Sequence, residues 1–304
     1  MRKLLFYGGL LFGVLALSTS AIFVKLAQAP SAITAFYRLF FSLLVLVPMV
    51  LFHPGHRAEL RKLTKKQWLL SMGSGLFLAV HYILWFESLR FTSVASSTVI
   101  VTLQPVFAML LGYCFLKERQ KRSAVVGCVI ALAGSFLIGY GDFQSGLLAL
   151  WGDCLALVAA AVISSYFFVG QMARKETSAT VYSLLGYLGS VLFLGLYAWI
   201  RQEPFFGFSG KTWLCFLGLA IVSTIMGQFI FNLLLKWLSA TTISMSILGE
   251  PIGTCLLAYF LLGERIAPKQ AIGIVIILGG LGLYFFSLVQ KPKEAAQEKT
   301  EQTA

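Results

Sequence analysis

A single carboxylate lies in the middle of an apolar stretch that is long enough to cross a lipid bilayer. The stretch runs from Thr241 to Arg265, TTISMSILGEPIGTCLLAYFLLGER, and the carboxylate belongs to Glu250. Pro251 follows directly and removes a backbone donor, so a helix here is expected to kink or open beside the charge. An acidic group near the centre of a membrane helix costs about 2.5 to 3.5 kcal/mol on insertion scales. Glu250 therefore indicates a polar cavity within the membrane.

The same layout occurs earlier in the chain. Aligning Gln104-Pro105 with Glu250-Pro251, an offset of 146 residues, pairs residues 81–140 with 227–286 without a gap, and 15 of these 60 positions are identical. The chain is therefore expected to consist of two homologous halves. The identical pairs include Ser93/Ser239, Tyr113/Tyr259, Glu118/Glu264, Arg119/Arg265, Gly127/Gly273 and Gly134/Gly280.

The composition excludes an ordinary water-soluble fold. Hydrophobic residues make up 58% of the 304 residues and charged residues only 12%, which is more apolar surface than one soluble core could bury. Lipid must cover the rest, so we predict an all-α integral membrane protein with ten transmembrane helices. The spans are expected at about residues 4–26, 33–52, 68–89, 95–116, 123–140, 147–170, 180–200, 212–235, 242–262 and 269–289.

The chain ends and the connections carry separate expectations. Met1 to Ala21 has a basic start and an apolar run, which is also the pattern of a secretory signal peptide, but the run continues through Val24 and we interpret it as the first span. Residues 290–304 are polar and are expected to form a disordered cytoplasmic tail. The loops are short, the longest being 53–66 and 201–211, so any function belongs to the membrane helices.

Positive charge is distributed unequally between the two sides. With a cytoplasmic N-terminus, 17 Lys and Arg residues fall on the inside, six fall on the outside and Arg38 lies within a span. This bias predicts that both termini are cytoplasmic, in the cytoplasmic membrane. The net charge of +12 comes from short runs between apolar segments, so we expect no nucleic-acid binding.

The orientation has a consequence for the two halves. Five helices per half is an odd number, so the second half must enter the membrane from the opposite side. We therefore predict two inverted-topology five-helix repeats, residues 1–141 and 142–289. Such repeats are typical of transporters, because two half-structures of opposite orientation can exchange conformations and open a central site to either side in turn.

Polar residues within the spans are the candidates for a substrate site. His81 and Trp85 share one helix face, as do Gln228 and Asn232, because each pair is spaced i, i+4. Thr242, Ser246, Gly249 and Gly253 form a stripe beside Glu250, which on its own favours close helix packing. We predict that one cavity near the bilayer centre is lined by His81, Trp85, Gln104, Gln228, Asn232 and Glu250.

Arg38 is the one basic residue within a span, and its role is left open. It lies about four residues from the outer end, so it could extend its charge to the membrane surface. Alternatively it pairs with a carboxylate, such as Glu87 or Asp153, or with an anionic group of the substrate. Arg38 and Glu250 are therefore also candidates for energy coupling or an ion pair.

Other kinds of chemistry have no signature in the chain. There is no G-x-x-x-x-G-K-[ST], H-E-x-x-H or G-x-S-x-G motif, so we expect neither an enzyme nor a cofactor. The five cysteines are scattered singly, and His53 and His56 resemble a metal pair only weakly, so no metal site is expected. Uphill transport would have to use an ion gradient or a counter-substrate.

Two segments carry a resemblance to a known family. ESLRFTSVASSTVIVTLQPVFAMLLGYCFLKER, the matching LSATTISMSILGEPIGTCLLAYFLLGER and the Gly-rich helix after each resemble the two EamA repeats of the drug/metabolite transporter superfamily. The resemblance extends over about residues 5–290. It implies ten helices in inverted repeats, a central substrate cavity and, usually, export of amino acids or related small metabolites. The chain departs from strict symmetry where Gln104 faces Glu250 and Lys117 faces Gly263.

Two functional hypotheses follow. The first is a secondary transporter that exports amino acids or related small polar metabolites by alternating access. The second is an importer of a nucleoside-like or cofactor-like metabolite, for which Tyr82, Trp85 and Phe86 would supply stacking surface. In either case Glu250 has two possible roles, proton coupling or contact with a cationic group of the substrate, because desolvation disfavours its charged form.

Overall fold

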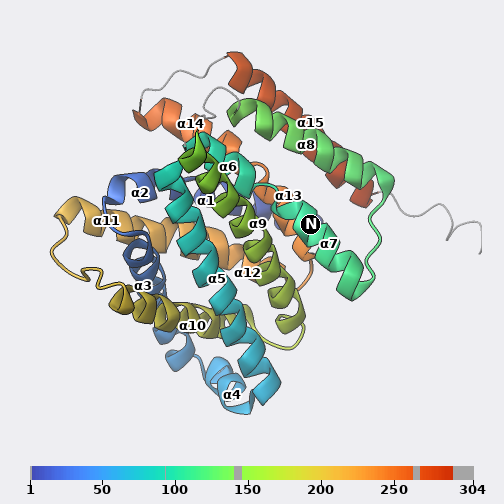
Figure 1. The fold of residues 1–304 in the computed structure, drawn as a ribbon. Coiled ribbons are helices and arrows are strands. Elements are labelled where there is room, and N and C mark those ends of the chain that lie inside the picture. The colour runs from blue at the N-terminus through green and yellow to red at the C-terminus, as the bar shows by residue number, and fades with distance from the viewer. Residues whose placement is uncertain (1, 93, 140–145, 263–267, 290–304) are drawn as a thin grey trace, which may run out of the picture.

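The computed structural model describes residues 2–92, 94–139, 146–262 and 268–289, and every regular element in these ranges is a helix (Figure 1). The expected tail, 290–304, lies outside the described residues. The helices are α1 Arg2–Ser18, α2 Ser20–Ala27, α3 Ser31–Phe52, α4 Pro54–Lys62, α5 Lys65–Phe91, α6 Val94–Val101, α7 Gln104–Leu116, α8 Arg122–Gly139, α9 Leu147–Ala173, α10 Ala179–Ile200, α11 Gly210–Gly218, the π-helix η1 Leu219–Gln228, α12 Phe229–Leu234, α13 Ala240–Ile247, α14 Glu250–Leu262 and α15 Pro268–Val289.

Eight segments of the described chain are long and apolar enough to cross a membrane, and each matches an expected span. The fifth expected span corresponds to α8, whose apolar part, Arg122–Leu137, is shorter than the others. The ninth is divided between α13 and α14. The all-α membrane fold is therefore confirmed, whereas the count of ten spans stays a prediction. The spanning segments are Leu5–Ala27, Ser31–Phe52, Lys65–Phe91, Ser96–Leu116, Leu147–Ala173, Ala179–Ile200, Gly210–Leu234 and Pro268–Leu288.

One connection differs from the expectation. Residues 53–66 were expected to form a loop, but they contain the short helix α4. Pro54 occupies its first turn, where a missing backbone N–H costs nothing, and Arg61 and Lys62 lie in its last turn, where they complement the helix dipole. Polarity alone did not distinguish this surface helix from a loop.

Each half contains a broken membrane helix, and the two breaks lie at equivalent positions. α7 begins at Gln104 and α14 begins at Glu250, 146 residues later, and the helices before them also end 146 residues apart. Just before each start, the amide of Leu103 or Gly249 donates to the carbonyl three residues earlier, at 3.0 Å in both cases. The proline at the second position of each new helix has no N–H to continue the preceding helix. Proline therefore accounts for both breaks.

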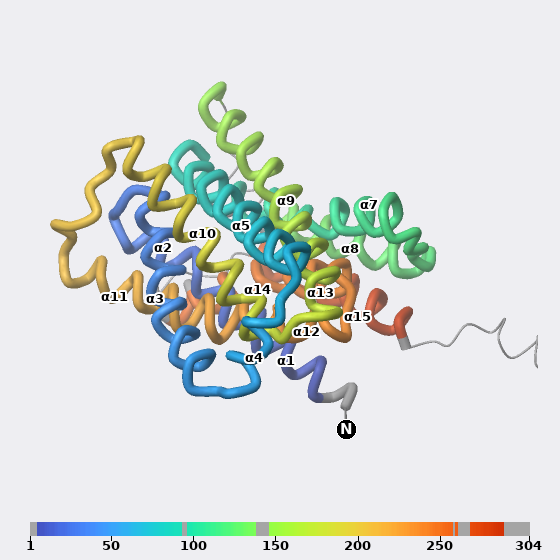
Figure 2. Tube along the Cα trace, turned by 90° about the horizontal axis from the view of Figure 1, so that it is seen from below, coloured from blue at the N-terminus to red at the C-terminus, as the bar shows by residue number. Residues whose placement is uncertain are grey.

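The last helix of each half packs against its equivalent. α8 and α15 lie side by side in Figures 1 and 2. A Cβ added to Gly127 would lie 2.7 Å from the carbonyl oxygen of Gly280, and one added to Gly134 would lie 2.7 Å from that of Gly273. Since Gly127 corresponds to Gly273 and Gly134 to Gly280, the two contacts exchange under the 146-residue offset. The halves are thus related by a pseudo-two-fold axis at this crossing.

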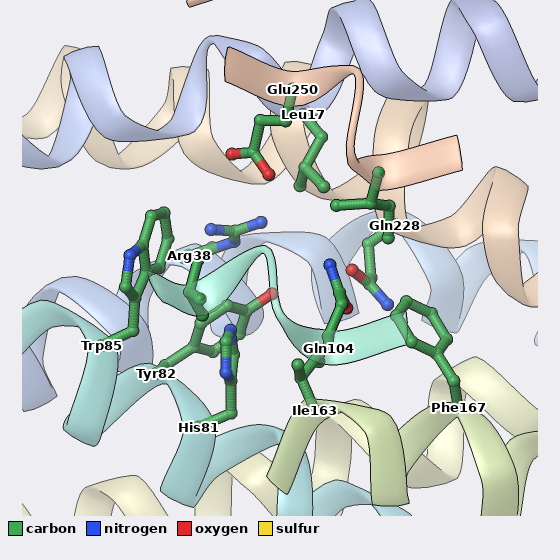
Figure 3. Close-up of a pocket in the computed structure, with 12 residues that line it drawn as sticks. Leu17, Arg38, His81, Tyr82, Trp85, Gln104, Ile163, Phe167, Gln228 and Glu250 are labelled. Carbon is green, nitrogen blue, oxygen red and sulfur yellow. The ribbon is translucent and has the colours of Figure 1, made fainter. Parts of the chain in front are cut away.

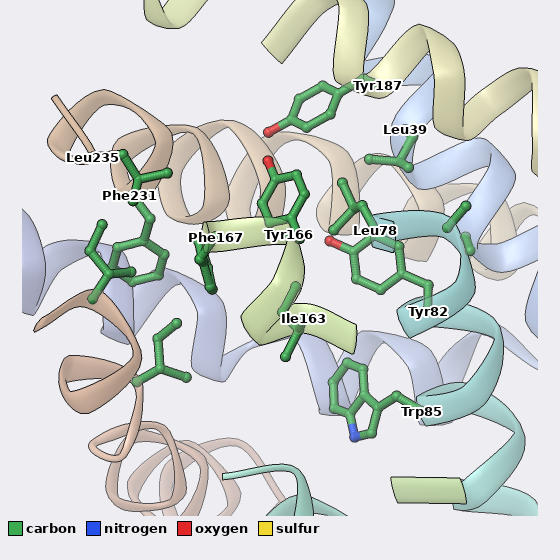
Figure 4. Packing of buried hydrophobic residues seen from close by; sticks show 14 of the residues in the cluster. Leu39, Leu78, Tyr82, Trp85, Ile163, Tyr166, Phe167, Tyr187, Phe231 and Leu235 are labelled. Atoms are coloured by element: carbon green, nitrogen blue, oxygen red, sulfur yellow. The ribbon is translucent and has the colours of Figure 1, made fainter. Parts of the chain in front are cut away.

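The largest buried cluster lies between α3, α5, α9, α10 and α12 (Figure 4). The long helices α5 and α9 run together through it (Figure 2). Aromatic side chains fill much of the space, among them Tyr166, Phe167 and Phe231, each at most 1% exposed. This cluster fixes the helices whose polar side chains meet at the site described next.

Candidate functional site

A small, largely buried pocket lies between the two halves (Figure 3). Its volume is about 40 Å³, which is small for a metabolite site. A metabolite would therefore require the surrounding helices to move apart. The lining residues come from both halves and are Leu17, Arg38, His81, Tyr82, Trp85, Val101, Gln104, Ile163, Phe167, Gln228, Ile247 and Glu250.

The lining repeats the internal symmetry of the chain. Eight of the twelve lining residues form four pairs, and the two members of each pair are 146 positions apart. The pocket therefore lies on the pseudo-two-fold axis that relates the halves. The sequence alignment began at residue 81, but the first of these pairs shows that the correspondence extends to the first helix of each half. The pairs are Leu17/Ile163, Tyr82/Gln228, Val101/Ile247 and Gln104/Glu250.

Five of the six candidate substrate-binding residues meet in this pocket. They are His81, Trp85, Gln104, Gln228 and Glu250. Asn232, the sixth, does not line it: Asn232 Oδ1 accepts a hydrogen bond from Tyr166 Oη at 2.8 Å, and its Nδ2 donates to Ser183 Oγ at 2.9 Å. Asn232 lies one turn beyond Gln228, about 6 Å further along the helix, where α9 and α10 fill the space. That the other five contact a substrate stays a prediction.

Arg38 lines the pocket and is fully buried, so it does not extend to the membrane surface. Its Nε donates to Thr224 Oγ1 at 2.8 Å and its Nη1 donates to Ser20 Oγ at 2.8 Å. The guanidinium carbon lies 4.4 Å from the centre of the Tyr82 ring, within range of a cation–π interaction. Neither carboxylate suggested as its partner faces it: Glu87 contacts Arg90, and Asp153 accepts from Ser96.

Glu250 is 4% exposed, and Figure 3 shows its carboxylate directed toward the guanidinium of Arg38. The position of Glu250 follows from the helix break, because it is the first residue of α14. A carboxylate at a helix N-terminus is favoured by the helix dipole, which lowers the cost of burying it there. The pocket therefore holds an acidic and a basic side chain within a membrane-spanning part of the protein.

Two serines bind the starts of the broken helices. Each serine belongs to one half and contacts the helix start of the other half. Ser18 Oγ donates to the carbonyl oxygen of Glu250 at 3.1 Å, and Ser164 Oγ donates to that of Gln104 at 2.7 Å. Ser18 and Ser164 are again 146 residues apart. In each case a helix of one half thus positions the pocket residue of the other half. Neither serine was identified from the sequence, because its role depends on a contact between distant segments.

The aromatic side chains at the pocket stack on neighbouring rings. The rings of His81 and Trp85 lie 6.0 Å apart with an angle of 16° between their planes, and Tyr82 stacks on Phe86 at 5.5 Å. His81 Nδ1 lies 3.0 Å from the carbonyl oxygen of Ala159, so this nitrogen carries the proton and donates. Phe86 is buried and does not line the pocket. The stacking surface expected from three residues is therefore reduced to Trp85 and Tyr82.

Gln228 reaches the pocket from an unusual element. It ends the π-helix η1, in which Thr224 Oγ1 donates to the carbonyl oxygen of Leu219, five residues earlier, at 2.9 Å. The π-helical turn is wider than an α-helical one, and such turns are frequent at functional sites. Here it places Thr224 against Arg38 and Gln228 in the pocket. The sequence contained no signal for it.

The small-residue stripe of the ninth expected span lies against α1 and α15, where Ser246, Gly249 and Gly253 also line an apolar pocket of about 540 Å³. Thr242 Oγ1 hydrogen-bonds Tyr284 Oη of α15 at 3.3 Å. A Cβ on Gly249 would lie 3.4 Å from Val14 of α1, and one on Gly253 would lie 2.2 Å from Ser18 Oγ. The stripe therefore faces α1 and α15 rather than the polar pocket.

Comparisons with known proteins agree with this fold. The model of the EamA-like transporter family matches residues 5–140 and 150–286. The uncharacterized transporter YwfM of Bacillus subtilis is 27% identical over 237 residues, which cover 76% of this chain and 77% of that protein. The riboflavin transporter ImpX of Fusobacterium nucleatum is 24% identical over 187 residues, which cover 60% of this chain and 62% of that protein.

A solved crystal structure shares the fold. It superposes with a TM-score of 0.74 over 90% of this chain and 94% of that chain, at 20% sequence identity. The structural likeness thus extends over nearly the full length of both chains, in agreement with the two segments that the family model matches. This chain is a multi-pass membrane protein that belongs to the EamA-like transporter family.

Proposed function

We propose that this protein is a secondary transporter that exports amino acids or related small polar metabolites across the cytoplasmic membrane. The proposal rests on the buried polar pocket at the pseudo-two-fold axis between the halves. Arg38 and Glu250 both line this pocket. Buried charges are expensive within a membrane and mark substrate or ion pathways. A site at the interface of two repeats is also the place that alternating access requires.

The small size of the pocket favours a small substrate. One face of the Tyr82 ring is occupied by Arg38, and the ring also packs against His81 and Phe86. Trp85 already stacks on His81. A large planar substrate would have to replace these contacts, whereas a small polar one needs only a modest separation of the helices.

A second candidate is import of a nucleoside-like or cofactor-like metabolite. The relative named as a riboflavin transporter favours it. In that case the amides of Gln104 and Gln228, which point into the same part of the pocket, would bind polar ring edges (Figure 3). Metabolite profiles separate the two candidates. For export, amino acids should accumulate inside cells that lack the protein and in the medium of cells that overproduce it. Depletion of a vitamin or nucleoside inside the deletion strain would instead support import.

Energy coupling centres on Glu250. Substitution by Gln keeps the size and hydrogen-bonding capacity of the side chain and removes its charge and titration. If Glu250 couples transport to protons, Glu250→Gln should still exchange substrate between the two sides of a vesicle but should no longer respond to a pH gradient. If Glu250 binds a cationic group of the substrate, exchange and gradient-driven flux should both be lost. Normal transport with an unchanged pH response would contradict both roles.

A further inference from the structure

Unpartnered polar atoms are concentrated around the pocket. A buried polar atom without a hydrogen-bond partner is unfavourable, because it has lost its bonds to water and gained none in the protein. Several such atoms in one cavity therefore indicate a place that is built for a ligand. Five buried side-chain atoms of the lining have no hydrogen-bond partner within the described residues: Arg38 Nη2, Tyr82 Oη, Trp85 Nε1, Gln104 Oε1 and Gln228 Nε2.

Arg38 is the charged member of this set, and its orientation is fixed. Ser20 of α2 and Thr224 of η1 hold two of its nitrogens, and the Tyr82 ring supports its face. Its Nη2 is the remaining nitrogen and has no partner in the described part of the chain. A planar guanidinium held in this way presents a donor that suits a carboxylate oxygen.

We propose that Arg38 forms a carboxylate subsite: Nη2 donates to a carboxylate oxygen of the transported molecule while Glu250 accepts from its ammonium group. The inference rests on the proposed function and adds which charged group of the substrate binds where. Charge balance supports it. Besides His81, the titratable lining residues with opposite charges are the basic Arg38 and the acidic Glu250, and their charged groups face each other. A carboxylate alone would bring uncompensated negative charge into a poorly solvated site, whereas a zwitterion adds no net charge.

The other end of the pocket suits a side chain. Gln104 and Gln228 contribute amides there, next to the apolar side chains of Ile163 and Phe167 (Figure 3). The polarity thus changes from a charged end at Arg38 and Glu250 to a mixed end at the two amides. A molecule with a charged backbone and a small neutral side chain matches this distribution.

The test compares free acids with their amides. Purified protein would be screened by thermal shift against the 20 L-amino acids. Each binder would then be compared with its α-carboxamide, which keeps the ammonium and the side chain but removes the negative charge. The wild-type protein should bind the free acid roughly tenfold or more tightly than the amide, as expected for a charge-assisted hydrogen bond. Arg38→Gln should bind the two with similar affinity.

Two further variants keep the test decisive. Thr224→Val removes an anchor of Arg38 but keeps its charge, so the acid-to-amide ratio should fall without vanishing. Arg174→Gln is the matched control: Arg174 is also buried, but it donates to the backbone carbonyls of Thr177, Asn232 and Leu233 and does not line the pocket. It should lower thermal stability and leave the ratio unchanged. If Arg38→Gln does not fold, the Thr224→Val ratio decides the question.

The outcomes separate the two proposals. If amino acids bind and the acid-to-amide preference survives in both Arg38→Gln and Thr224→Val, the subsite is overturned and the proposed function stands. A wild-type protein that binds acids and amides equally overturns the subsite as well. If no amino acid binds and the metabolite profiles show no export, the proposed function fails and the subsite fails with it.

Discussion

At the scale of single residues, pocket lining and hydrogen bonding separate the roles of two buried residues that the sequence grouped together. Gln228 lines the pocket, whereas Asn232 joins Tyr166 and Ser183 in a buried hydrogen-bond network. The i, i+4 spacing placed both on one helix face, but the pocket is too short to reach both. Asn232 therefore connects α12 to α9 and α10.

This difference predicts the behaviour of Asn232→Leu. The substitution leaves the Tyr166 and Ser183 hydroxyls without their partner, so it should lower the free energy of unfolding by about 1–3 kcal/mol. Thermal unfolding in detergent would measure the loss. The double variant with Tyr166→Phe should lose less than the sum of the single changes, because both partners of one bond are then absent. A raised KM with unchanged stability would instead show that Asn232 contacts the substrate.

At the scale of helices, close backbone contact defines the crossing of α8 and α15. A Cβ on Gly280 would lie 2.4 Å from the amide nitrogen of Ala131, whereas nothing lies within 4 Å of a Cβ on Gly279. Gly280→Ala should therefore push the helices apart and cost about 1–3 kcal/mol. The neighbouring change, Gly279→Ala, should leave the melting temperature nearly unchanged or raise it slightly. Equal melting temperatures for the two variants would show that the helices do not cross at Gly280.

At the scale of the whole molecule, the two halves are expected to have opposite orientations in the membrane. The bias of 17 against six positive residues predicts that reporter fusions after Lys66 and Arg122 are cytoplasmic. Fusions near Asp142, which lies outside the described residues, and near Pro268 should be external. Enzymatic reporters that are active on only one side of the membrane would measure this. An external signal after Arg122 would remove the inverted-repeat arrangement and the main support for alternating access.

The sequence alone was sufficient for the fold class and for the internal repeat. Apolar runs of about 20 residues have few alternatives to membrane helices, and the paired prolines mark the same position in both halves. It also identified the main polar candidates, because a polar residue within an apolar span stands out without knowledge of its neighbours. His81, Gln104 and Glu250 were recognised in this way, and the structure places them in one pocket.

Only the tertiary structure decided which polar residues face one another. Arg38 lies near the end of its expected span, yet α2 and η1 bury it completely. No pattern within one helix shows which other helix will cover it. The contacts of Ser18 and Ser164 with the opposite half likewise join segments 232 and 60 residues apart. Helical periodicity defines a face, but the packing of other helices against that face determines whether it meets lipid, another helix or the pocket.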